Sequence, residues 1–122
     1  MPNPVVHFEI LGKDGSKTKE FYKSLFGWQV QETGPEMGFY GLVDAQDGKG
    51  AAGGLGVAMD GQPLVTFYVE VDDPQAYLDK AVSMGATVAQ PVMEIPGVTT
   101  IAQFRDPDGN LVGITGHNPA RG

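Results

Sequence analysis

Two glutamates are the paired ionisable residues of the strand-like segments in this sequence. Glu9 lies in an alternating segment at residues 5–10, and Glu70 lies in a similar segment at residues 67–71. If both carboxylates reach one partly dry site, mutual repulsion and desolvation favour the protonated form of at least one of them. Such a pair could act as a general base and acid. The alternative is that each glutamate is solvated or paired with a cation such as Arg105.

The segments that carry these glutamates begin two similar halves of the chain. Each is followed by an apolar pattern typical of a helix, then by a glycine that can end the helix, and then by further strand-like sequence. The two patterns have the same internal spacing: Phe21, Tyr22, Leu25 and Phe26, and Tyr77, Leu78, Ala81 and Val82. This repetition predicts two β-α-β-β-β modules, at about 4–60 and 64–116, within a single domain spanning 1–122.

Short polar motifs predict where the helices begin. Asp14 or Ser16 can accept hydrogen bonds at the start of a helix near residues 16–26, and Asp73-Pro74 is a typical helix start. A predicted strand at 51–59 is rich in glycine, which often marks a bulge or a close approach of another group to the backbone.

Composition excludes several classes of function. The 122 residues are 41% hydrophobic, enough for a folded core, and the formal net charge of -7 argues against nucleic acid and anionic membranes as partners. The chain has no cysteine, which removes disulfides, thiol nucleophiles and thiolate metal sites. No apolar run is long enough to span a bilayer, and residues 1–4 lack the features of a secretory signal. We therefore expect a soluble cytoplasmic protein.

Two such modules in one short chain resemble the vicinal oxygen chelate superfamily, which includes glyoxalase I, extradiol dioxygenases, and the bleomycin and fosfomycin resistance proteins. The resemblance covers nearly the whole chain and rests on residues 7–10, on residues 21–28 and on the late motif at 104–110. It implies an α+β fold in which the modules form a curved mixed β-sheet cup with helices on the convex face. These motifs indicate the fold rather than the reaction.

The resemblance also implies which side chains meet a ligand. Strand alternation places Phe8, Ile10, Phe67, Val69 and Val71 under the helices, and His7, Glu9, Thr66, Tyr68 and Glu70 toward the cup. Phe104 adds aromatic surface that could stack on a flat ligand, although core packing accounts for most aromatic residues. We therefore expect ligand binding by His7, Glu9, Thr66, Tyr68, Glu70 and Phe104, with Glu9, Glu70 and Tyr68 as the candidates for catalysis.

Metal-using members of the superfamily place ligands on the first and last strand of each module. The resemblance puts His7 at the first ligand position and Tyr68 at its counterpart in the second module. Gly113 stands where a glutamate is usual, and residues 52–55 offer no carboxylate or imidazole. A divalent ion needs several converging donors, so we expect no metal cofactor. A divalent ion bound in part by His7 is the alternative.

These observations predict a glyoxalase/bleomycin-resistance-like protein that binds a small molecule in the cup without a catalytic metal. One alternative is a metal-dependent lyase or dioxygenase that uses His7. A second alternative is a non-catalytic module for protein association. By analogy with relatives of this length, we expect a homodimer, and we expect neither nucleic acid nor a membrane as a partner.

Overall fold

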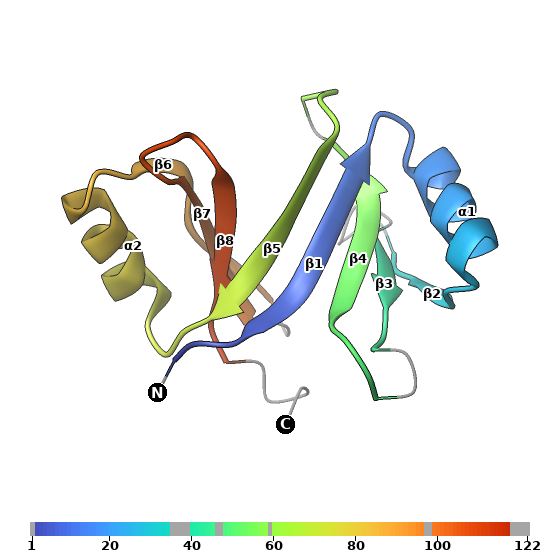
Figure 1. Ribbon diagram of the computed structural model, residues 1–122, viewed down its shortest axis with the longest axis horizontal. Helices are drawn as coiled ribbons and strands as arrows, with labels where there is room; N and C mark the ends of the chain where they lie inside the picture. The colour runs from blue at the N-terminus through green and yellow to red at the C-terminus, as the bar shows by residue number, and fades with distance from the viewer. Residues whose placement is uncertain (1, 35–39, 46–47, 59, 97–98, 118–122) are drawn as a thin grey trace. The chain divides into compact units, whose positions relative to one another are not determined.

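The computed structural model of the protein describes residues 2–34, 40–45, 48–58, 60–96 and 99–117. Over these residues the chain forms two helices and eight strands, and the β-α-β-β-β order occurs twice (Figure 1). The elements are β1 (Val5–Gly12), α1 (Gly15–Phe26), β2 (Val30–Glu32), β3 (Gly41–Val43), β4 (Ala52–Val57), β5 (Leu64–Glu70), α2 (Pro74–Ser83), β6 (Thr87–Ile95), β7 (Thr99–Arg105) and β8 (Leu111–Thr115). The predicted α+β fold with two tandem β-α-β-β-β modules is confirmed.

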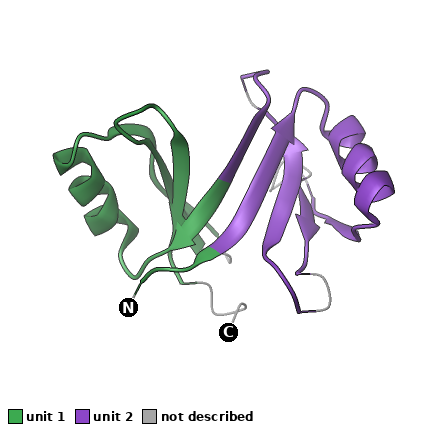
Figure 2. Ribbon diagram, viewed as in Figure 1, with its two compact units in different colours: residues 1–5, 67–122 green, residues 6–66 purple. Residues whose placement is uncertain are grey.

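The chain divides into two compact units (Figure 2). Unit 2 is residues 6–66, and unit 1 combines residues 1–5 with residues 67–122. The division falls inside β5, and the first residues of the chain belong with unit 1. There the backbone N–H of Glu70 donates to the Pro4 carbonyl at 2.9 Å.

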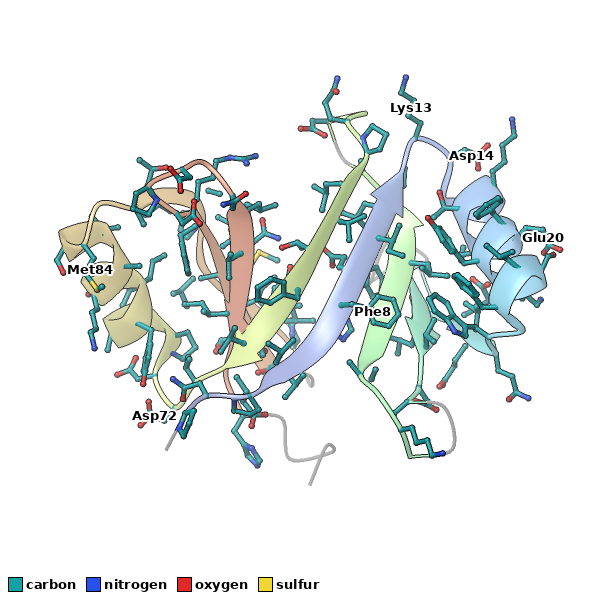
Figure 3. All side chains as sticks on the ribbon, in the orientation of Figure 1. Phe8, Lys13, Asp14, Glu20, Asp72 and Met84 are labelled. Carbon is teal, nitrogen blue, oxygen red and sulfur yellow. The ribbon has the colours of Figure 1, made fainter. Side chains whose placement is uncertain are left out.

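The sheet of unit 2 is mixed. β1 runs parallel to β4, with His7 opposite Ala52, and the antiparallel pairs β4–β3 and β3–β2 extend the sheet. Before α1, the Asp14 carboxylate accepts hydrogen bonds from the backbone N–H groups of Ser16 and Lys17 (Figure 3). These bonds use backbone donors that have no partner within the helix. The sequence allowed Asp14 or Ser16 as the N-cap, and Asp14 is the one observed.

An aromatic cluster joins α1 to its sheet. The Phe8 ring on β1 lies 5.3 Å from the ring of Trp28, which follows the helix. Trp28 in turn lies 5.1 Å from Phe26 and 6.0 Å from Tyr22, both on α1. Phe8 therefore faces the helix, as the alternation predicts, and its neighbours His7 and Glu9 project from the opposite face of β1.

The sheet of unit 1 repeats the same mixture of pairings. β5 runs parallel to β8, with Tyr68 opposite Gly113, and the antiparallel pairs β8–β7 and β7–β6 complete it. α2 begins after Asp73, whose carboxylate accepts from the backbone N–H of Ala76, and Pro74 occupies the first turn. This is the helix start that the sequence predicted. Neither described helix is long and apolar enough to cross a membrane.

The hydrophobic core of unit 1 lies between α2 and one face of its sheet. Its buried residues are Val71, Leu78, Ala102 and Ile114, with Val69, Tyr77, Val92 and Phe104 packed against them. Because side chains alternate along a strand, Tyr68 on β5 and Gln103 on β7 project from the opposite face. In both units, therefore, the candidate polar side chains lie on the face of the sheet away from the helix.

Candidate ligand-binding residues in the two units

Unit 2 contains a hydrogen-bonded cluster of His7, Tyr40 and Glu9, which we call the Tyr40 cluster. The Tyr40 hydroxyl oxygen lies 2.9 Å from Nε2 of His7, and the hydroxyl donates to Oε1 of Glu9 at 3.0 Å. The rings of Tyr40 and His7 stack with an angle of 19° between their planes and 6.2 Å between their centres. All three side chains are half-buried. A single phenol thus bridges two titratable groups of β1.

Glycines of β4 make room for the Tyr40 ring. A Cβ atom at Gly54 would overlap the Tyr40 ring, and one at Gly56 would lie 2.9 Å from Cδ1 of that ring. Gly54 is paired with Glu9 in the sheet register, so the ring that covers Gly54 also reaches the Glu9 carboxylate. The hydroxyl of Thr33 holds the Tyr40 backbone by donating to its carbonyl at 2.6 Å. The lack of side chains at Gly54 and Gly56 on β4 therefore allows the Tyr40 ring to take its place in the cluster.

Unit 1 places Tyr68 against the backbone of β8. Tyr68 is buried, with 6% of its surface exposed, and its hydroxyl accepts a hydrogen bond from Nε2 of Gln103 at 2.8 Å. A Cβ atom at Gly113 would overlap the Tyr68 ring. Tyr68 was expected to face a ligand, and it does lie on the face away from α2. In this structure, however, most of its surface is covered by protein.

The two predicted glutamates belong to different units and have different partners. Glu9 belongs to the Tyr40 cluster, whereas Oε2 of Glu70 lies 3.8 Å from Nδ1 of His117. The side chain of Glu70 is 23% exposed and that of His117 is 60% exposed. Each glutamate therefore has a polar neighbour within its own unit. The sequence-based hypothesis of a coupled glutamate pair stays a prediction.

The other two predicted ligand-binding residues are Thr66 and Phe104. Thr66 is buried, with 4% of its surface exposed. Phe104 packs against the hydrophobic core of unit 1, on the side of the sheet that carries α2. It therefore lies on the opposite face from Tyr68 and Gln103, and we leave it out of the proposed site. The aromatic composition of its segment did not reveal which face it takes.

The residues at the expected metal positions do not fit a catalytic metal ion. The sheet register pairs His7 with Ala52 and Tyr68 with Gly113, so the four positions lie in two adjacent pairs. Alanine and glycine supply no side-chain donor, and the space for a side chain at Gly113 is filled by the Tyr68 ring. Within the described part of the chain, no three histidine, aspartate or glutamate side chains group together as metal ligands would.

Tyr40 and Gln103 were missing from the sequence-based set of site residues. The glycine-rich segment that forms β4 did indicate a close approach to the backbone, and Tyr40 makes that approach at Gly54 and Gly56. The glycine pattern does not identify the ring that approaches. Nor does the sequence show that this ring reaches Glu9, because Tyr40 and Glu9 are 31 residues apart in the chain.

Comparison with known proteins identifies relatives over most of the chain. The family model of the Glyoxalase/Bleomycin resistance protein/Dioxygenase superfamily matches residues 5–114. Proteins named "Putative glyoxylase CFP32" from Mycobacterium bovis and Mycobacterium tuberculosis are 33% identical over 107 residues. The alignment covers 83% of this chain and 41% of each relative, so the chain spans less than half the length of these curated relatives.

Solved structures with the same fold include two methylmalonyl-CoA epimerases. The enzyme from Mycobacterium tuberculosis has a TM-score of 0.66 at 18% identity, covering 96% of this chain and 89% of its own. A variant of the Streptomyces coelicolor enzyme, in complex with 2-nitronate-propionyl-CoA, has a TM-score of 0.67 at 19% identity, covering 95% of both chains. At these identities the likeness shows the fold alone.

Proposed function

We propose that this chain, which belongs to the Glyoxalase/Bleomycin resistance protein/Dioxygenase superfamily, binds a small molecule without using a catalytic metal. The observation that carries the proposal is the Tyr40 cluster. Its three polar side chains converge on the face of the sheet away from α1 and are only half-buried. A small number of convergent polar groups is one feature of small-molecule sites.

The charges of the protein disfavour an anionic ligand and favour one that carries hydrogen-bond donors. An ionised carboxylate can only accept hydrogen bonds, so Glu9 and Glu70 both call for donors. The formal net charge of -7 would also repel a polyanion over a distance set by the ionic strength. The coenzyme A ester bound by the Streptomyces coelicolor epimerase is therefore a comparison compound rather than the ligand we expect.

Metal-free binding is supported by the chemistry at the expected ligand positions. Ala52 and Gly113 supply no donor, and the Tyr68 hydroxyl is hydrogen-bonded to Gln103. His7 is the one imidazole among these positions, and its Nε2 contacts Tyr40. A divalent ion that prefers imidazole and carboxylate would meet one such ligand where it needs several.

Proton transfer is a second candidate function, which the Tyr40 cluster favours. Glu9 can take a proton from a bound molecule as a general base, and Tyr40 can stabilise the ionised form of Glu9 by donating to it. Among the residues predicted for catalysis, Glu9 has the hydrogen-bond network suited to this role. Glu70 and Tyr68 stay candidates for contacts with the ligand.

We also propose that the protein forms a homodimer. Three large apolar side chains of α1 are exposed: Phe21 to 59%, Leu25 to 59% and Phe26 to 57%. A second copy of the chain would remove part of this apolar surface from water. Sedimentation velocity at micromolar concentration tests this, and a monomer under these conditions would contradict it.

A thermal-shift screen tests the binding proposal. Uncharged amides, polyols and phenols are screened beside coenzyme A thioesters, because a ligand that binds only the folded state raises the melting temperature. We expect hits among the uncharged donors and weaker responses in Glu9→Gln, with Glu20→Gln on the exposed face of α1 as the matched control. A screen without any hit would favour the association module.

Metal analysis tests the other half of the proposal. The protein is purified without chelator, and its zinc, nickel, manganese and iron contents are measured. We expect substoichiometric metal. One equivalent of any of these ions, lost in His7→Ala, would overturn the proposal in favour of a metal-dependent lyase or dioxygenase.

A further inference from the structure

We propose that Tyr40 is a positioning residue that holds neutral His7 as the tautomer protonated on Nε2. The tautomer is inferred from hydrogen bonds within unit 2. Its consequence for ligand recognition rests on the proposed function.

The assignment follows from the number of protons in the Tyr40 cluster. The Tyr40 hydroxyl has one proton, which it donates to Oε1 of Glu9. An ionised carboxylate has no proton to give back. The contact of 2.9 Å between the Tyr40 oxygen and Nε2 of His7 can then be a hydrogen bond only if Nε2 carries the proton. The chain of donors therefore runs from His7 through Tyr40 to Glu9.

The position of the Tyr40 ring is set by the surface beneath it. The ring lies on Gly54 and Gly56 of β4, and Thr33 anchors its backbone. Gly53, the neighbour of Gly54, faces the other side of the sheet, where a Cβ atom would overlap the Phe8 ring. Consecutive glycines on one strand thus accommodate two different aromatic rings on opposite faces.

The tautomer determines what His7 offers a ligand. In a neutral imidazole one nitrogen donates and the other accepts, so protonation of Nε2 leaves Nδ1 as the acceptor. A ligand group that meets Nδ1 of His7 must then carry a donor, as must a group that meets the Glu9 carboxylate. The His7 imidazole and the Glu9 carboxylate therefore both favour a ligand that carries hydrogen-bond donors.

Nitrogen-15 NMR of the histidine rings tests the assignment without any ligand. The chain has two histidines, so a His117→Asn variant assigns both sets of signals. Spectra are recorded at about pH 9, where an ordinary imidazole is neutral. We expect His7 of the folded protein to show the Nε2-protonated pattern alone. The same protein unfolded in urea provides the reference for a mixture of the two tautomers.

Three variants separate positioning from general stability. Tyr40→Phe removes the bridging hydroxyl, and Gly54→Ala displaces the ring while keeping the hydroxyl. Both are expected to move His7 toward the mixture of tautomers that the unfolded protein shows. Gly53→Ala is the matched control, because it crowds Phe8 on the other face and is expected to leave the His7 signals unchanged.

Two results would overturn the proposal. One is a wild-type His7 protonated on Nδ1, and the other is an effect of Gly53→Ala as large as that of Gly54→Ala. Either result would leave the ligand screen intact as a test of the proposed function. Conversely, a screen without hits would leave the measured tautomer of His7 unaffected.

Discussion

Each unit places a tyrosine ring over a glycine, on β4 in unit 2 and on β8 in unit 1, but the two units use the phenol differently. Tyr40 covers Gly54 in unit 2, and Tyr68 covers Gly113 in unit 1. The Tyr40 hydroxyl connects two ionisable side chains, whereas the Tyr68 hydroxyl accepts from the neutral amide of Gln103. The duplicated scaffold thus repeats a way of packing and does not repeat the chemistry.

The two tyrosines also reach their glycines from different places in the sequence. Tyr68 belongs to β5, whose residues pair directly with β8, while Tyr40 lies just before β3. Tyr68 is buried and Tyr40 is half-buried. We therefore expect the ring of Tyr68 to contribute more to the free energy of unfolding than the ring of Tyr40. We expect the hydroxyl of Tyr40 to contribute more than the hydroxyl of Tyr68.

The largest expected effect is that of removing the Tyr68 side chain. Truncation of a buried aromatic residue costs about 3–5 kcal/mol through lost burial and a residual cavity, and we expect Tyr68→Ala to lie in that range. Tyr40→Ala should cost less because Tyr40 is more exposed. Urea denaturation gives both free energies of unfolding. Equal losses, or a larger loss for Tyr40→Ala, would contradict the comparison.

Filling the space at Gly113 should destabilise the protein by about 1–3 kcal/mol, the usual cost of overpacking. The φ angle of Gly113 is not positive, so the expected cost of Gly113→Ala comes from the overlap with the Tyr68 ring. Because these residues are in contact, the cost should shrink in a Tyr68→Ala background. A Tyr40→Ala background is the control and should leave the cost unchanged. If both tyrosine substitutions reduced the cost of Gly113→Ala equally, the proposed difference between the two units would be wrong.

Removal of the hydroxyl alone should reverse the order of the two tyrosines. Tyr40→Phe loses a hydrogen bond to a carboxylate and is expected to cost about 1.5 kcal/mol, whereas Tyr68→Phe loses a neutral bond and should cost about 1 kcal/mol or less. A pH series of unfolding free energies sharpens the difference. Tyr40→Phe should change the pH dependence of stability, because the Tyr40 hydroxyl contacts the titratable side chains of His7 and Glu9.

The smallest expected effect concerns Asp106, at the β7–β8 turn of unit 1. Hydrogen bonds from the side chain and backbone of Asn110 lower the pKa of Asp106 below its ordinary value of 3.8. A lowered pKa in the folded state stabilises the fold above about pH 3.8, and this stabilisation disappears as the pH falls through the lowered value. Asp106→Asn should therefore lose less stability than wild type between about pH 4 and 2. Parallel acid profiles of the two proteins would show that the turn contributes nothing.

The local signals in the sequence predicted the ends of the helices well. Asp14 and Asp73 start α1 and α2 because their carboxylates accept from backbone N–H groups a few residues later in the chain. Gly27 follows α1 with φ at 72°, a left-handed conformation that glycine adopts without strain. Such interactions lie within a few residues of the sequence, so residue type and spacing are enough to predict them.

Strand alternation also placed several candidate side chains correctly. The period of two put His7 and Glu9 on the face opposite Phe8, and the structure has them there. Alternation gives the two faces of one strand but does not say what covers either of them. For Phe104 that missing information mattered, because its strand has apolar residues on both faces and the core around α2 took the face with Phe104.

Residue types and spacing therefore predict the repeated modules, the helix ends and the faces of β1. Which side chains meet on those faces depends on the tertiary fold. Tyr40 and Glu9 are 31 residues apart in the chain, and they come together because β1, β4 and β3 are neighbours in the sheet. Tyr68 and Gln103, 35 residues apart, meet through the pairing of β5, β8 and β7. Contacts of this kind depend on strand order and on the space above glycines, which no local pattern encodes.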